Sequence, residues 1–183
     1  FHGNSFNIGD RANRIKKYID KNWNVILVSW RGFGGNNGKP TEKNLYKDGE
    51  AVLKWVSKNT NFTKDQIIIY GESLGSGVAV ELGTKYNFLS IVLEAPFTSI
   101  YDIANKRYKI YPTKYLVKDK FDNLSKIDKI KSPLLILSGK KDEVVPHNHS
   151  LLLLNKAKVI KKGVFIDEAI HNNLYDYGIE KDV

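Results

Sequence analysis

One short stretch of this sequence places a serine where it could do chemistry. Residues 67–79 read Ile-Ile-Ile-Tyr-Gly-Glu-Ser-Leu-Gly-Ser-Gly-Val-Ala, a buried strand followed by Gly-x-Ser-x-Gly and a small-residue helix start. A sharp strand-to-helix turn lifts Ser73 Oγ clear of the sheet, and Gly71 and Gly75 leave room for the crossing backbones. The backbone N–H of Leu74 then lies at a helix N-terminus, which favours negative charge. The pattern predicts a nucleophilic serine.

A serine hydroxyl needs a base, and the base needs a carboxylate that orients it. His171 follows the last predicted strand, and Asp142 follows an earlier strand in Gly-Lys-Lys-Asp. The order Ser73, Asp142, His171 is that of the Ser-Asp-His hydrolases with a Gly-x-Ser-x-Gly turn. Asp142 could instead cap the turn that follows it. Glu94, which also ends a strand, is the competing acid, although the nearby Pro96 suggests a structural corner.

The remaining histidines and acids near these motifs have simpler explanations. His147 and His149 form His-x-His, which could bind a metal, but no third ligand has a telling spacing, so we interpret them as a solvated helix start. Asp167 and Glu168 are interpreted as solvated groups, and Glu72 as a structural ion-pair partner. No metal or cofactor is expected.

The elements that must position these residues alternate along the chain. Apolar runs predict strands over residues 24–30, 66–70, 89–93, 133–138 and 163–166. Helical spacing begins at Ile8, after a Thr41 cap, at Gly75, near Ser150 and after Asn173. Strands that alternate with helices predict an α/β fold with a mostly parallel sheet, in a single domain over residues 1–183.

Composition limits the partners of the protein. The 183 residues carry a formal charge of +9, but the lysines are scattered rather than gathered in a stripe, so a nucleic-acid partner is not expected. A membrane surface stays open as a partner. There is no cysteine, and therefore no disulfide and no thiolate nucleophile. The sequence does not decide between a cytoplasmic and a membrane-associated location, and it does not indicate an oligomeric state.

Taken together, the motifs resemble the α/β-hydrolase superfamily, in its small single-domain group with a His-Gly-Asn-x-x-Asn opening. The chain is also similar to acyl-protein thioesterases and serine-aminopeptidase-like hydrolases. The matching stretches are residues 2–7, 30–34, 38–40, 70–75, 94–98, 139–146 and 169–172. The resemblance implies cofactor-free ester or thioester hydrolysis with Ser73 as nucleophile, His171 as base and Asp142 as its orienting acid. It also implies that Leu74 and Asn4 supply the amides of an oxyanion hole.

Two departures from the family pattern concern the entrance to the site. Phe6 stands where the family often has Gly, and Trp30 where it often has Tyr. Both would add bulk near the entrance, and Phe6 is therefore a predicted substrate-binding residue.

Regular alternation lapses over residues 98–124, where aromatic and basic residues are mixed. In this fold such an insertion would lie over the serine as a small lid. Tyr108 and Tyr111 would then contact an acyl or lipid-like substrate, while the lysines would suit an anionic head group or membrane surface. The alternative is a helix that packs its own aromatic side chains inward.

Two other functions compete with acyl-ester hydrolysis. A peptidase remains open, because acyl-transfer groups do not by themselves choose an ester over an amide. A non-catalytic binding module with an anionic partner would have no use for a complete set of nucleophile, base and acid.

A further expectation concerns the sheet. In the resembling fold, the strand that ends at His2-Gly3 lies between the strand over 24–30 and the strand before Ser73. Only Phe1 precedes His2 here, so we expect further residues upstream to supply that strand. The alternative is that residues 24–30 pair directly with residues 66–70.

Overall fold

The computed structural model describes residues 1–4, 8–108 and 110–183 and confirms the predicted α/β fold. The described residues form a parallel four-stranded sheet in the order β1-β2-β3-β4. The strands are β1 (Ile68–Glu72), β2 (Ser90–Glu94), β3 (Leu134–Gly139) and β4 (Lys161–Ile166). The α-helices are α1 (Ala12–Ile19), α2 (Glu42–Asn59), α3 (Leu74–Lys85), α4 (Ile100–Arg107), α5 (Thr113–Leu116) and α6 (His147–Lys156). Short 3₁₀ turns are η1 (Gly9–Arg11), η2 (Lys64–Gln66), η3 (Ile127–Lys129), η4 (Leu174–Tyr177) and η5 (Ile179–Lys181).

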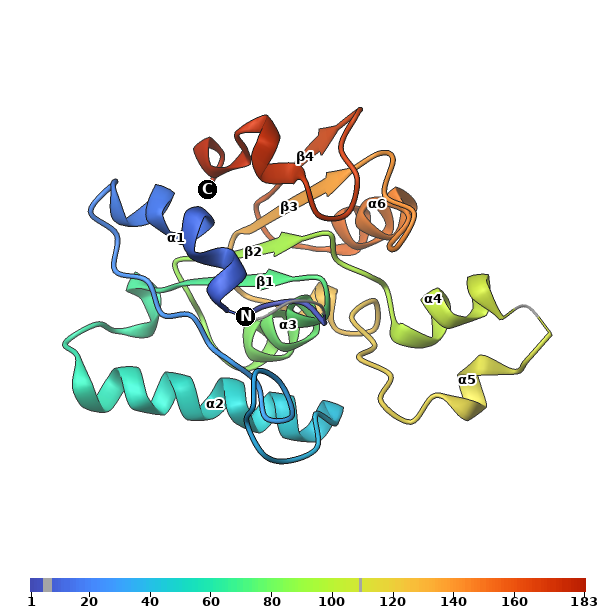
Figure 1. Ribbon diagram of the computed structural model, residues 1–183, viewed down its shortest axis with the longest axis horizontal. Helices are drawn as coiled ribbons and strands as arrows, with labels where there is room; N and C mark the ends of the chain where they lie inside the picture. Colours follow the sequence, from blue (N-terminus) through green and yellow to red (C-terminus); the bar gives the residue numbers. More distant parts are fainter. Residues whose placement is uncertain (5–7, 109) are drawn as a thin grey trace.

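Helices cover both faces of the sheet (Figure 1). On one face, side chains such as Ile91 and Leu93 pack with α2, α3 and α6. On the other face, Val92 and Leu137 pack with Leu174 of η4 and with η5, beside α1. Because the strands are parallel, all their carboxyl ends lie at one edge, and loops that follow β1, β3 and β4 meet there.

The predicted helix after Thr41 is α2, and Thr41 caps it by accepting a hydrogen bond from the Asn44 N–H at 3.4 Å. Gly49 lets α2 approach α3 closely, because a Cβ at Gly49 would lie 2.7 Å from Val78. This contact packs α2 against α3, the helix that begins directly after Ser73.

The predicted strand over residues 24–30 is wrong. This segment is described but forms no strand, and Val25 and Ile26 are exposed. A groove of about 680 Å³ separates the segment from β1. A strand needs a hydrogen-bonded neighbour, and across the groove the segment has none among the described residues. The alternative of direct pairing with β1 is therefore also wrong.

Phe1 occupies one end of this groove. Its amino group donates to Tyr70 O at 2.9 Å, and its carbonyl accepts from Glu72 N at 2.9 Å, which is the spacing of a strand neighbour. That a further strand fills the rest of the groove stays a prediction.

Among the described residues of 98–124, α4 and α5 pack together, and we call this part of the chain the α4–α5 hairpin. It projects beyond the carboxyl ends of the strands, at the edge where α3 begins (Figure 1). Two backbone hydrogen bonds close its base, from Ile100 N to Lys120 O at 2.8 Å and from Leu124 N to Thr98 O at 2.9 Å. That this hairpin acts as a lid stays a prediction. None of the described helices is both long and apolar enough to cross a bilayer.

Candidate active site

Ser73 stands on a strained turn between β1 and α3. Its φ of 48° and ψ of −112° place a non-glycine residue in a conformation that L-residues rarely adopt. The neighbouring glycines make the turn feasible, since a Cβ at Gly71 would lie 2.6 Å from Gly75 O, and one at Gly75 would lie 2.2 Å from Phe1 O. This geometry is the strand-turn-helix predicted from the sequence, and it presents the hydroxyl at the helix N-terminus.

The structure brings Ser73 and His171 together, although 98 residues separate them in the sequence. Nε2 of His171 lies 3.2 Å from Ser73 Oγ, and Nδ1 lies 2.7 Å from Oδ2 of Asp142. Nδ1–H can therefore donate to Asp142, which leaves Nε2 free to accept the serine proton. The three side chains are therefore joined by two contacts in the order Ser73, His171, Asp142, an arrangement that we call the relay.

Asp142 is held in place by the turn after β3. Its Oδ1 accepts hydrogen bonds from Val144 N at 2.9 Å and Val145 N at 2.7 Å, while Oδ2 faces His171. Its carboxylate is fully buried. One oxygen of Asp142 therefore caps the turn, as one interpretation predicted, and the other contacts His171. That Asp142 acts as the orienting acid stays a prediction.

Gly3, near the start of the chain, lies close to Ser73. A Cβ added at Gly3 would lie 3.2 Å from Ser73 Cβ, so a larger residue would crowd the serine. Leu74 is the first residue of α3. The N–H groups of the first helical turn have no hydrogen-bond acceptor within the helix, and the Leu74 N–H is one of them. Asn4 is exposed next to Gly3. Their roles in an oxyanion hole stay predictions.

A buried charged cluster lies behind the turn, and sequence reasoning found only part of it. Glu72 accepts two hydrogen bonds from Arg11, at 2.7 and 2.8 Å, which confirms it as a structural ion-pair partner. Arg14 lies 3.5 Å from Glu94 Oε1, and Tyr70 Oη donates to Glu94 Oε2 at 2.8 Å. The cluster therefore holds Glu72, which precedes Ser73 in the chain, and Glu94, whose carbonyl accepts from Ser73 N.

The two carboxylates of this cluster differ in acidity. Burial raises the pKa of Glu94 to about 7, and the nearby charge of Glu72 adds to the effect. Burial opposes the ionised form of Glu72 too, but Arg11 and Arg14 hold its pKa below the usual value. Glu94 has no contact with His171 among the recorded hydrogen bonds of the described residues, so Asp142 is the acid that the geometry pairs with the base.

The arginines of this cluster carried a weak signal in the sequence. Arg11 and Arg14 are three residues apart at the start of a predicted amphipathic helix, a spacing that puts both on one face. Nothing in the sequence indicated that this face would point at the sheet rather than at solvent.

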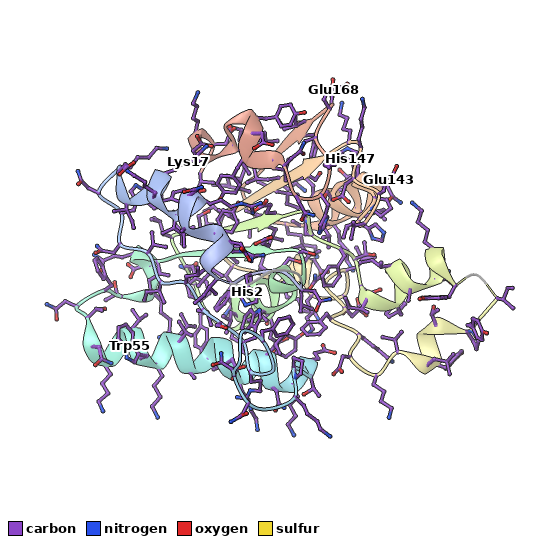
Figure 2. The ribbon with its side chains drawn as sticks, viewed as in Figure 1. His2, Lys17, Trp55, Glu143, His147 and Glu168 are labelled. Atoms are coloured by element: carbon purple, nitrogen blue, oxygen red, sulfur yellow. The ribbon has the colours of Figure 1, made fainter. Side chains whose placement is uncertain are left out.

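The His-x-His pair does not converge on a site. His147 Nδ1 lies 3.0 Å from Ser138 Oγ, whereas His149 Nδ1 lies 2.8 Å from Thr98 Oγ1. His149 is buried, so its predicted solvation is wrong. Within the described ranges, no three His, Asp or Glu side chains come together as metal ligands. Glu168 projects outward and pairs with Lys141 at the surface (Figure 2).

The predicted entrance residues fare differently. Trp30 is fully buried, stacks on Phe1 at 5.3 Å and donates from Nε1 to His2 O at 3.0 Å, so the prediction that it adds bulk at the entrance is wrong. Trp30 packs beneath the N-terminal residues Phe1 and His2. Phe6 lies outside the described residues. Tyr108 and Tyr111 are exposed on the α4–α5 hairpin, and their role in substrate binding stays a prediction.

Fold and site together define an α/β-hydrolase. A family model described as the prolyl oligopeptidase family matches residues 29–173, and the chain belongs to this family. Among curated relatives, the human alpha/beta hydrolase domain-containing protein 17B is 34% identical over 180 residues, which cover 97% of this chain and 60% of that protein. The chain thus spans about three fifths of the length of these relatives.

Solved structures show the same fold. A monoacylglycerol lipase of Paleococcus ferrophilus superposes with a TM-score of 0.74 at 19% identity, over 99% of this chain and 88% of the lipase. An esterase of Pyrococcus furiosus superposes with a TM-score of 0.77 at 23% identity, over 99% of this chain and 76% of the esterase.

Proposed function

We propose that the protein is a serine hydrolase that cleaves carboxylic ester or thioester bonds through an acyl-enzyme intermediate. The observation that carries the proposal is the relay from Ser73 Oγ to His171 Nε2 at 3.2 Å and from His171 Nδ1 to Asp142 Oδ2 at 2.7 Å. The names of the similar structures, a lipase and an esterase, agree with an acyl substrate.

In the first half of the reaction, Ser73 Oγ attacks the acyl carbonyl while its proton passes to Nε2 of His171. The new Oγ–C bond makes a tetrahedral oxyanion, which the amides of Leu74 and Asn4 would stabilise. As the oxyanion collapses, the bond to the leaving oxygen or sulfur breaks, and Nε2 returns its proton to the leaving group. Asp142 keeps the imidazolium oriented throughout.

In the second half, water attacks the acyl-enzyme. His171 Nε2 takes a proton from the water, the Oγ–C bond breaks, and Ser73 recovers its proton as the carboxylic acid leaves. The residues described supply each proton transfer, so this pathway needs no cofactor to balance.

Amide cleavage is the second candidate, favoured by the match to the prolyl oligopeptidase family. The relay would serve an amide equally well, since Nε2 of His171 can protonate a leaving amine. The two candidates differ in the leaving group and not in the acylated residue.

Labelling with a fluorophosphonate probe tests the proposal directly. We expect stoichiometric labelling of wild-type protein at Ser73 and none in Ser73→Ala. Hydrolysis of an acyl-ester series, the matching thioesters and an aminoacyl amide then separates the two candidates. Absence of labelling in folded protein would contradict both.

A further inference from the structure

The tip of the α4–α5 hairpin exposes an unusual run of large apolar side chains. Five of them lie within nine residues, and Ile110 and Tyr115 are 94% and 84% exposed. The set, which we call the apolar tip, consists of Tyr108, Ile110, Tyr111, Tyr115 and Leu116. Soluble proteins tolerate single exposed apolar residues, but five large ones within nine residues of a protruding hairpin indicate a surface that another phase or molecule covers.

The base of the α4–α5 hairpin packs against the rest of the protein. Phe121 is buried against α3, since a Cβ at Gly77 would lie 2.5 Å from its ring, and it meets Tyr46 edge-on at 5.5 Å. Asn123 Nδ2 donates to Phe97 O at 3.0 Å. Apolar side chains at the base therefore turn inward, whereas those at the tip turn outward.

The net positive charge of residues 98–124 indicates that the surface covering the apolar tip is anionic. Residues 98–124 contain six basic and three acidic residues. The acidic side chains are engaged locally: Asp102 accepts from Thr98 Oγ1 at 2.6 Å, Asp119 accepts from Glu42 N at 2.8 Å, and Asp122 accepts from Ser125 N at 3.1 Å. By contrast, Lys106, Lys118 and Lys120 are exposed, and none of the recorded ion pairs of the described residues includes them. The positive charge is available to an external anion.

We propose that the α4–α5 hairpin docks the protein on an anionic lipid bilayer, with the apolar tip entering the head-group region and Lys106, Lys118 and Lys120 facing acidic lipids. Tyrosines suit this interface because their rings are apolar and their hydroxyls stay hydrated. The hairpin projects from the edge that carries Ser73, so docking would turn the nucleophile toward the membrane (Figure 1). The docking surface itself does not depend on the proposed hydrolysis.

Vesicle sedimentation of the Ser73→Ala protein tests the surface without turnover. We expect binding to phosphatidylcholine vesicles that contain roughly a third phosphatidylserine, weaker binding to pure phosphatidylcholine, and loss of binding as salt rises. Lys106→Gln/Lys118→Gln/Lys120→Gln should weaken binding about a hundredfold, at about fivefold per lysine. Ile110→Ser/Tyr115→Ser/Leu116→Ser should weaken binding to both kinds of vesicle.

Matched controls remove the same chemistry elsewhere. Lys54→Gln/Lys58→Gln/Lys158→Gln deletes three exposed lysines, and Ile19→Ser/Leu152→Ser/Ile160→Ser deletes three exposed apolar side chains. Both control variants should bind vesicles as strongly as the Ser73→Ala protein that carries no other change. When Ser73 is restored, all four variants should hydrolyse a water-soluble acetyl ester with the kcat/KM of the wild type. The proposal is overturned if the parent ignores acidic lipid, if the controls lose as much binding as the hairpin variants, or if the apolar variant loses self-association and not vesicle binding.

Discussion

Tyr70 of β1 and Glu94 of the adjacent strand β2 are joined by a hydrogen bond, in which the tyrosine hydroxyl donates to the buried carboxylate at 2.8 Å. Both residues lie next to the turn that carries Ser73, one before it in the chain and one beside it in the sheet. The hydrogen bond and Arg14 at 3.5 Å do not fully offset the desolvation of Glu94, whose pKa burial raises to about 7.

This carboxyl predicts a pH-dependent stability. The folded protein keeps Glu94 protonated up to about pH 7, whereas the unfolded chain releases the proton near its usual pKa of 4.5, so the folded state binds more protons between these values. The free energy of unfolding should therefore fall as pH rises through this window, by at most on the order of 3 kcal/mol. Glu94→Gln should flatten the dependence in urea unfolding between about pH 5 and 8. An unchanged slope in Glu94→Gln, with Tyr70→Phe as the control that keeps the carboxyl, would contradict the assignment.

The choice of acid gives a second prediction. Asp142→Asn should lower kcat for ester hydrolysis by about 10⁴-fold, because an amide no longer holds His171 in the required tautomer. Ser73→Ala and His171→Ala should do at least as much harm, since the three residues act as a unit. Glu94→Gln serves as the matched control and should keep most of the activity. The assignment fails if Asp142→Asn stays near wild type while Glu94→Gln loses activity.

The sequence predicted the relay because each of its members follows a strand of the parallel sheet. Apolar runs located β1, β3 and β4 to within a few residues, and parallel strands bring their carboxyl ends together. Ser73, Asp142 and His171 could therefore be placed at one edge without knowledge of any contact. The Gly-x-Ser-x-Gly spacing added the strained turn, which depends only on local backbone geometry.

Other features depend on tertiary contacts that leave no periodic signal. Residues 24–30 are as apolar as a central strand, but strand formation needs a hydrogen-bonded neighbour that composition does not reveal. Trp30 was predicted to lie at the entrance to the site, but it is buried beneath Phe1 and His2. The contacts of Arg14 with Glu94 join residues 80 positions apart, and no pattern in the sequence pairs them.

The packing of Phe121, at the base of the α4–α5 hairpin, gives a third prediction. Phe121→Ala should lower the free energy of unfolding by roughly 3 kcal/mol or more, because its ring fills the space over Gly77 and beside Tyr46. For a chain of this size the melting temperature should fall by about 10 °C. Because Phe121 packs on the helix that begins after Ser73, probe labelling should slow as well. Tyr115→Ala, an aromatic deletion at the exposed tip, should leave both the melting temperature and the labelling rate unchanged, and equal losses in the two variants would contradict the packing argument.

The groove beside β1 gives the last prediction. Phe1 bonds to Tyr70 and Glu72, so the even-numbered residues of β1 direct their backbone groups into the groove, whereas the bonds of Ile67 O and Ser73 N show that the odd-numbered residues face β2. In residues 1–183 alone, the amides of Ile68 and Tyr70 should exchange with solvent much faster than those of Ile69 and Gly71 in hydrogen-exchange NMR. Ile91 and Val92 of β2, which has a neighbour on each side, provide the internal control and should both be protected. Equal protection of all four β1 amides, together with a cooperative thermal transition and full probe labelling of Ser73, would show that the groove requires no further strand.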